Sequence, residues 1–237
     1  MIRNGLVMVL VFVWLGPGLS AQSPPTQSEN KWEVSPFVGF GGARDDTFAT
    51  PVEEGASQNV GLDVDQSFVL GIRITENRGR YLGAEFEYSF TNQPLFFRDL
   101  SPTLPSLALD HTVHKLAYSL LVYGRERPAR IRPFGSIGFG TSFFHVSNDS
   151  QDEALRQGVK LKNRWKLAFS YGGGVKFRMA PRWGISVDIR DQLTGVPDFG
   201  FPSQAPLLEG GETGPGFRAE GLLHNWQTTF GFVYHLR

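Results

Sequence analysis

The chain has 237 residues, with 28 glycines, 15 prolines, no cysteine and 13% aromatic residues. That length allows one domain or two small ones. The 23 basic and 23 acidic residues cancel, which argues against a strongly basic nucleic-acid-binding protein. The lack of cysteine excludes disulfide scaffolds, cysteine zinc sites, thiol catalysis and lipid attachment to an N-terminal cysteine.

The one long apolar run lies at the N-terminus. Arg3 precedes ten apolar residues, 6–15, and a Gly-Pro-Gly sequence at 16–18 ends the run. Ten helical residues span about 15 Å, which is half of the hydrocarbon core and too short for a membrane helix. The pattern is typical of a secretory signal peptide that is cleaved near Ser20 or Ala21. We therefore expect a signal peptide over 1–21, a short polar lead-in over 22–31 and one domain over 32–237.

From Trp32 onward, apolar residues recur at every second position in eight segments, which is the signal of β-strands. An apolar band of roughly 25 Å, crossed at about 40°, needs roughly ten residues per strand, and these segments have nine to fourteen. No segment keeps a helical period, and we expect only a short helical turn within 153–162. The segments are 32–41, 67–75, 81–90, 114–123, 131–144, 165–178, 182–191 and 225–237.

The two faces of these strands differ in chemistry. One face is bulky and apolar, as in the series from Phe68 to Ile74, and the other is mostly Gly, Ser and Ala with single charges. A soluble lipocalin-like barrel or sandwich is the alternative, but it would need long polar side chains outside. The small-residue face fits the narrow lumen of an eight-stranded barrel better, although Phe37 and Phe134 fall on it. Four tryptophans lie at strand ends on the bulky face, as in the aromatic girdles of lipid-facing barrels: Trp32, Trp165, Trp183 and Trp226.

The connections between the segments alternate in length. Segments 76–80, 124–130 and 179–181 are short, whereas 42–66, 91–113, 145–164 and 192–224 are long. The long connections, with the flanking Asp191, hold sixteen acidic and seven basic residues, and the rest of the chain holds seven and sixteen. In lipid every backbone amide must be paired, so the sheet must close. The sequence therefore predicts an all-β transmembrane antiparallel up-and-down β-barrel with eight strands, short periplasmic turns and four long external loops.

Several motifs support this prediction through a resemblance. PFVGFG at 36–41, RPFGSIGFG at 132–140 and GISVDIR at 184–190 occur in three of the strands. With their order and spacing, the chain resembles the OmpA-like eight-stranded outer-membrane β-barrel family over nearly all of its mature part. The last strand, 229–237, is similar to the C-terminal signal read by the barrel-assembly machinery, but it ends in Leu236-Arg237 and not in an aromatic residue. The resemblance implies a monomer in the cell outer membrane, surrounded by lipid and lipopolysaccharide, without a peptidoglycan-binding domain.

The charges on the small-residue face are the first candidate site. A charge buried in a narrow lumen must pair, because an unpaired one costs several kcal/mol. Two interpretations stay open: a salt-bridged plug that fixes the barrel, or a gated, ion-selective path. The residues are Arg73, Glu85, Glu87, Lys176, Asp188 and Arg190.

Two weaker candidates lie in the long connections. His145 and Ser147 resemble the His-x-Ser of outer-membrane lipid A deacylases, with Glu153 needed to orient the imidazole. Acidic residues of these connections could bind Ca²⁺ or Mg²⁺, although their spacing fits solvated loops as well. We expect no catalytic site, metal or cofactor, no nucleic-acid partner, and a structural or surface-interaction role through the loops. A small ion-conducting pore is the alternative, and a lipid A-modifying enzyme is third.

Overall fold

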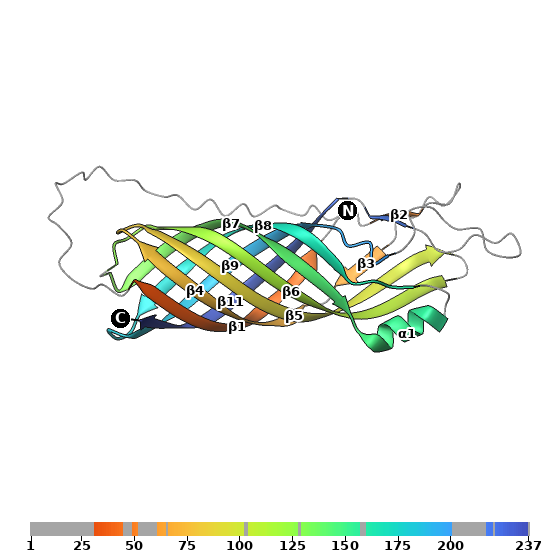
Figure 1. Ribbon diagram of the computed structural model, residues 1–237, viewed down its shortest axis with the longest axis horizontal. Coiled ribbons are helices and arrows are strands. Elements are labelled where there is room, and N and C mark those ends of the chain that lie inside the picture. Colours follow the sequence, from red (N-terminus) through yellow and green to blue (C-terminus); the bar gives the residue numbers. More distant parts are fainter. Residues whose placement is uncertain are drawn as a thin grey trace, which may run out of the picture.

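A long cylinder of strands dominates the molecule (Figure 1). The computed structural model describes residues 31–44, 49–51, 61–64, 66–101, 104–127, 129–156, 160–200, 217–219 and 221–236. The expected signal peptide and residues 22–30 of the lead-in lie outside the described residues. The strands of the cylinder are β1 (Trp32–Arg44), β4 (Ser67–Arg78), β5 (Leu82–Ser101), β6 (Leu104–Tyr123), β7 (Ile131–Val146), β8 (Arg164–Arg178), β9 (Trp183–Gly195) and β11 (Leu222–Leu236).

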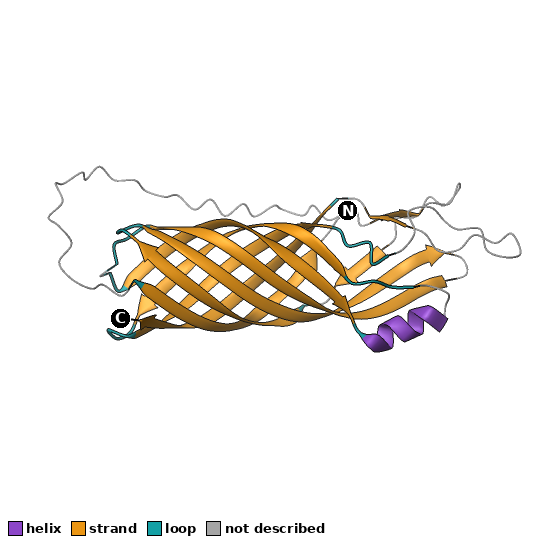
Figure 2. Ribbon diagram, in the orientation of Figure 1, coloured by secondary structure: helices purple, strands orange, loops and turns teal. Residues whose placement is uncertain are grey.

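These eight strands form a closed antiparallel barrel (Figure 2). Their order is β5-β4-β1-β11-β9-β8-β7-β6, and pairing between β5 and β6 completes the circle. The first and last strands are neighbours, with Val38 opposite Phe230. Closure pairs the backbone without leaving a free edge around the cylinder. This confirms the predicted fold class.

The two ends of the barrel differ. At the turn end, which we define by the connections 79–81, 124–130 and 179–182, short segments join the strands. The loop end is the opposite end, where the tips of β5 and β6 and helix α1 (Asn148–Arg156) extend beyond the cylinder (Figure 1). The last described residue, Leu236 of β11, lies at the turn end.

Most of the segment 91–113, which we predicted to be a loop, continues strands β5 and β6. Their ladder runs from the pair Leu82–Val122 to the pair Ser101–Leu104, with an irregularity after Arg98. The prediction was wrong because the period-two pattern stops within this segment, and Pro94 has no N–H to donate to a ladder. Backbone pairing between two adjacent strands can continue without a period of two. Beyond the lipid layer, the two faces of a strand need not carry different kinds of side chain.

The smaller elements lie at the loop end. Strand β3 (Gly61–Val64) pairs with β5, and β2 (Ala49–Pro51) pairs with β10 (Phe217–Ala219). Helix α1 begins five residues before the helical turn predicted for 153–162. Among the described residues, no helix is both long enough and apolar enough to cross a membrane.

The bulky face of the strands points outward, and the small-residue face lines the lumen. Phe139 is 71% exposed and Leu167 is 86% exposed, whereas Ser89, Ser142 and other small polar residues are buried. Phe37 and Phe134, the two exceptions in the pattern, point into the lumen and are buried. The Arg73 guanidinium lies 4.0 Å from the Phe37 ring centre. A ring face attracts a cation, so these two aromatic rings stabilise the arginine side chains that lie over them in the lumen.

Candidate functional site in the barrel lumen

The six charged residues predicted to share the lumen come together inside the barrel. They lie on β4 (Arg73), β5 (Glu85 and Glu87), β8 (Lys176) and β9 (Asp188 and Arg190), and all six are buried. Strand alternation explains the convergence, since every second residue of each strand points inward.

Two arginines and two carboxylates form a closed ring at the centre. Arg73 donates through Nε to Glu87 Oε2 at 2.6 Å and through Nη1 to Asp188 Oδ2 at 2.7 Å. Arg190 completes the ring, because its Nη1 lies 3.1 Å from Glu87 Oε2 and its Nε donates to Asp188 Oδ1 at 3.1 Å. We call these four residues the central ring. Since β4 and β9 are separated by β1 and β11 in the sheet, the central ring ties opposite walls of the barrel.

Neutral side chains complete the hydrogen bonding of the ring. Arg73 Nη2 donates to Thr229 Oγ1 at 3.1 Å, and Gln227 Nε2 donates to Glu87 Oε1 at 2.7 Å. Glu85 accepts from Arg190 Nη2 at 2.6 Å and from Thr75 Oγ1 at 2.7 Å. A buried charge is tolerated when it is both paired and hydrogen-bonded, and the members of the ring meet that condition.

The glycine run of β8 makes room for the β9 part of the ring. Gly172 is opposite Arg190 and Gly174 is opposite Asp188 in the β8–β9 ladder. A Cβ atom at either glycine would overlap the backbone and side chain of its partner. The alternation of residues within β8 alone does not connect this run with the charged residues that it faces.

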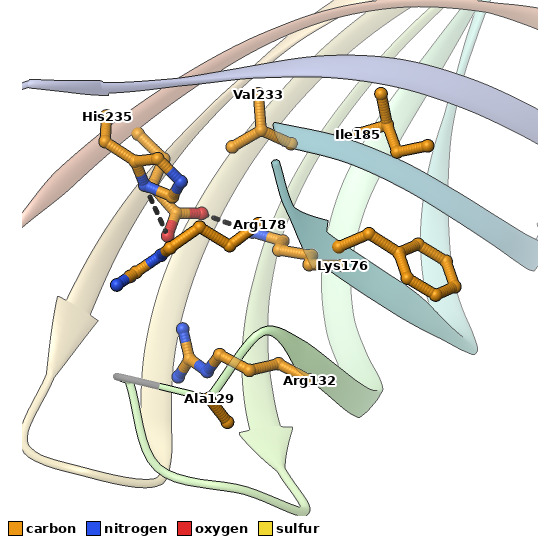
Figure 3. A pocket seen from close by; sticks show the side chains of 9 residues that line it. Ala129, Arg132, Lys176, Arg178, Ile185, Val233 and His235 are labelled. Carbon is orange, nitrogen blue, oxygen red and sulfur yellow. Dashed lines mark hydrogen bonds and ion pairs between the residues drawn. The ribbon is translucent and has the colours of Figure 1, made fainter. Parts of the chain in front are cut away.

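A second group of polar side chains lines a small cavity toward the turn end, where Figure 3 shows Arg132, Lys176 and His235. Lys176 Nζ donates to Glu33 Oε2 at 2.7 Å, and Asn77 Nδ2 donates to Glu33 Oε1 at 2.8 Å. His235 Nδ1 lies 3.4 Å from Glu33 Oε1, without the geometry of a hydrogen bond. Arg132 stacks on the Tyr123 ring at 3.6 Å. The turn end of the lumen therefore holds paired or stacked cations around a small cavity of about 10 Å³.

Sequence reasoning missed Glu33. Its position has the same parity as Ser35 and Phe37, so it lies on the lumen side of β1, where all three are buried. Sorting β1 by the same parity rule as the other strands would have found it.

Buried ring side chains pack against one another in the lumen toward the loop end. Phe199 is fully buried, its ring centre 6.2 Å from that of Phe144 and 5.8 Å from that of His111. The chain turns inward after β9, and Phe199 adopts a φ of +46°, which is rare for a bulky residue. Its carbonyl accepts from the Lys162 N–H at 2.7 Å. We call Phe144, Phe199 and His111 the apolar plug.

The inward turn is held by an ion pair between Arg164 Nε and Asp198 Oδ1. Asp198 Oδ1 also accepts from the Gly200 N–H at 3.4 Å. Nothing in the sequence patterning pointed to Asp198 and Gly200, because they follow the last alternating position of β9.

The His-x-Ser pair lies where β7 ends and α1 begins. Ser147 Oγ accepts from the Ser150 N–H at 3.2 Å and thereby caps the start of α1. His145 stacks on Phe143, with ring centres 6.1 Å apart. Within the described ranges, no hydrogen bond joins His145 to Ser147, and the side chain of Glu153 lies outside them.

The four predicted girdle tryptophans lie at both ends of the barrel. Trp32 and Trp183 lie toward the turn end, and Trp165 and Trp226 lie toward the loop end. Three of them are exposed: Trp32, Trp165 and Trp183. Acidic residues 45–46, 53–54, 65, 209 and 212 of the expected cation-binding loops lie outside the described residues. Within the described part of the chain, no group of three or more His, Asp and Glu residues is placed to hold a metal ion.

Comparison with known proteins identifies the family. Residues 12–234 match the family described as outer membrane protein beta-barrel domain. The chain belongs to this family. Membership places this barrel in the outer membrane, as predicted, and shows that the resemblance drawn from its motifs was correct.

Solved structures agree on the architecture. The barrel is similar to the outer membrane protein OprG from Pseudomonas aeruginosa, with 14% identity, a TM-score of 0.54 and coverage of 87% of this chain and 98% of that one. It is also similar to the outer membrane protein AlkL, solved in lipid bilayers, with 14% identity, a TM-score of 0.50 and coverage of 94% and 97%. At such identities the likeness shows the fold alone. No curated protein matches the sequence of the chain.

Proposed function

We propose that this protein is a non-enzymatic outer-membrane barrel with a closed lumen, and that it acts through the surface of its loop end. The central ring is the observation that carries the proposal, because it crosses the lumen and each of its four charged side chains is paired with an opposite charge. The apolar plug supports it, since it fills the same lumen nearer the loop end.

In this proposal the turn end faces the periplasm and the loop end faces the exterior. Short periplasmic turns and longer external connections are the usual arrangement of such barrels. The outward bulky face contacts lipid, the four tryptophans lie at the two membrane–water interfaces, and lipopolysaccharide surrounds the outer half. The barrel is a monomer, and β11 is the strand read by the barrel-assembly machinery before it pairs with β1.

The extended hairpin of β5 and β6 is the surface that we assign to interaction. Its ladder continues beyond the barrel, and β3 and α1 lie near it (Figure 1). Regular backbone pairing gives this extension a defined shape, so a partner could bind it without first ordering a loop.

A shortened hairpin tests this assignment. Asn92 and Thr112 are ladder partners, so joining them through an Asn-Gly turn removes the extension and leaves the barrel ladder intact. We expect the variant to fold, seen as different migration of boiled and unboiled samples in gels, but to fail to restore the phenotype of a deletion strain. Full restoration by the shortened variant would assign the function to the barrel itself.

Conductance tests the closed lumen. In planar bilayers we expect wild-type protein to show no discrete openings. Uniform openings that change with Glu85→Gln but not with the control Glu126→Gln would establish the alternative, an ion-conducting pore. The control removes a carboxylate that pairs with Arg80 at 3.4 Å outside the lumen. The observation that favours the pore is the polar lining, since Ser, Thr and charged residues continue along the lumen face.

The enzyme hypothesis has a separate test. Lipid A acylation is compared in cells that express the wild type and His145→Ala. We expect identical lipid A from both, because Ser147 serves as a helix cap. A change that depends on His145 would contradict the non-enzymatic proposal.

A further inference from the structure

The turn end of the barrel carries an excess of positive charge. Its three connections with their flanking residues, 76–80, 124–130 and 178–182, hold seven arginines and two acidic residues. The long connections have the opposite excess. None of these seven arginines belongs to the central ring, so the ion pairs of the lumen do not account for them.

Most of this charge is not neutralised by the protein. Arg78 pairs with Glu76 at 2.8 Å and Arg80 pairs with Glu126 at 3.4 Å, which uses both acidic residues. The other guanidinium groups without a hydrogen bond or ion pair to any described residue are those of Arg125, Arg130, Arg178 and Arg182. These side chains are exposed or half-buried, so an anion in the surroundings can reach them.

Three of these arginines lie on neighbouring strand ends. The Arg178 N–H donates to the Arg130 carbonyl at 2.7 Å, which joins the ends of β8 and β7. Arg178 is at the edge of the turn-end cavity (Figure 3). Arg182 lies in the turn between β8 and β9, and its carbonyl accepts from the His235 N–H at 2.8 Å. The backbone thus gathers three positive charges on one side of the barrel rim.

An exposed apolar residue follows each of the three arginines directly. The pairs are Arg130-Ile131, Arg178-Met179 and Arg182-Trp183. At a membrane–water interface, an apolar side chain contacts the acyl chains while a neighbouring cation reaches the headgroups. The rim therefore has the chemistry of a lipid contact, because a soluble acidic partner would not need the row of apolar side chains.

We propose that Arg130, Arg178 and Arg182 bind the phosphate groups of anionic phospholipids at the rim of the turn end. The planar guanidinium group can donate two parallel hydrogen bonds to one phosphate. Each basic side chain near an anionic membrane surface strengthens binding by about fivefold. The headgroup binding rests on these side chains alone. That the lipids are those of the periplasmic leaflet rests on the orientation given under the proposed function.

Quenching of tryptophan by brominated lipids tests the proposal. The protein is placed in vesicles of phosphatidylcholine and phosphatidylglycerol, with either lipid brominated in its acyl chains. One variant keeps only Trp183 at the turn end, and another keeps only Trp165 at the loop end. We expect phosphatidylglycerol to be preferred by about fivefold beside Trp183 and not beside Trp165. Equal preference at both tryptophans would overturn the proposal.

Matched charge variants identify the side chains. Arg130→Gln with Arg182→Gln, in the Trp183 protein, should abolish the preference. Lys160→Gln with Lys162→Gln removes two exposed charges at the loop end and should leave it unchanged. All four side chains are exposed, so we expect both variants to fold, as checked by different migration of boiled and unboiled samples. A preference that survives the arginine substitutions would show that these arginines do not bind the headgroups.

Two further measurements separate the possible sources of the phosphate and the orientation. Soluble glycerol phosphate, added at constant ionic strength and equimolar with the lipid, should not change the quenching. Loss of the preference would assign the arginines to a free phosphate compound instead of a lipid. Because vesicles offer both leaflets the same lipids, the result does not depend on orientation. A label on the turn end that reacts from outside intact cells would contradict the proposed orientation, and with it the periplasmic leaflet, but not the headgroup binding.

Discussion

Side chains cross the lumen at two levels, with opposite kinds of chemistry. At the centre, charged side chains from β4, β5 and β9 pair across the barrel. At the loop end, Phe144 and Phe199 pack against each other and against His111. An ion-pair network is directional and fails when one partner is removed, whereas an apolar layer loses contacts in proportion to what is deleted. The comparison shows that one lumen can be crossed by directed ion pairs at one level and filled by apolar contacts at another.

Breaking the central ring should have the largest effect. Arg73→Met leaves Glu87 and Asp188 with Arg190 as their remaining ring partner. We expect the free energy of unfolding to fall by about 3–5 kcal/mol, measured by urea unfolding in lipid with tryptophan fluorescence. The control is Arg78→Met, whose exposed guanidinium pairs with Glu76 at 2.8 Å and should contribute at most about 1 kcal/mol. Equal losses in the two variants would show that the central ring is not what holds the walls.

Opening the apolar plug should have the next largest effect. Phe144→Ala removes a buried ring that contacts Phe199 and His111, with an expected loss of about 3 kcal/mol. The same unfolding assay measures it, and Leu155→Ala is the control. Leu155 lies exposed on α1, so its substitution should change stability by less than about 0.5 kcal/mol. A Phe144→Ala protein as stable as this control would mean that the plug is not packed.

The central ring could be predicted from the sequence, and the apolar plug could not. Arg73, Glu87, Asp188 and Arg190 lie inside regular strands, where a period of two fixes the face of every residue. Phe199 follows β9, where the alternation has stopped and the chain turns inward. No local pattern encodes that turn, because it depends on contacts with residues of β6 and β7. The continuation of β5 and β6 was missed for a related reason, since backbone pairing there needs no alternation.

The ion pair between Glu33 and Lys176 tests the charged part of the lumen a second time, with a smaller expected change in the free energy of unfolding. Each single variant, Glu33→Gln or Lys176→Met, leaves one buried charge without its 2.7 Å partner. We expect the double variant to lose less stability than the sum of the two, by about 1–3 kcal/mol. Urea unfolding of all four proteins measures this coupling energy. Simple additivity would show that the two residues act independently of their ion pair.

The smallest effect concerns the backbone of the plug. At most positions alanine stabilises a protein relative to glycine, because glycine has more freedom to lose on folding. Phe199 has a φ of +46°, a region that costs a residue with a Cβ atom about 1–2 kcal/mol. We therefore expect Phe199→Gly to be more stable than Phe199→Ala by about 1 kcal/mol, although both lose the ring. Thermal unfolding of the two variants under identical conditions measures the difference. The reverse order would mean that the chain relaxes once the ring is gone, and that packing of the ring, not the ion pair of Asp198, imposes the left-handed conformation.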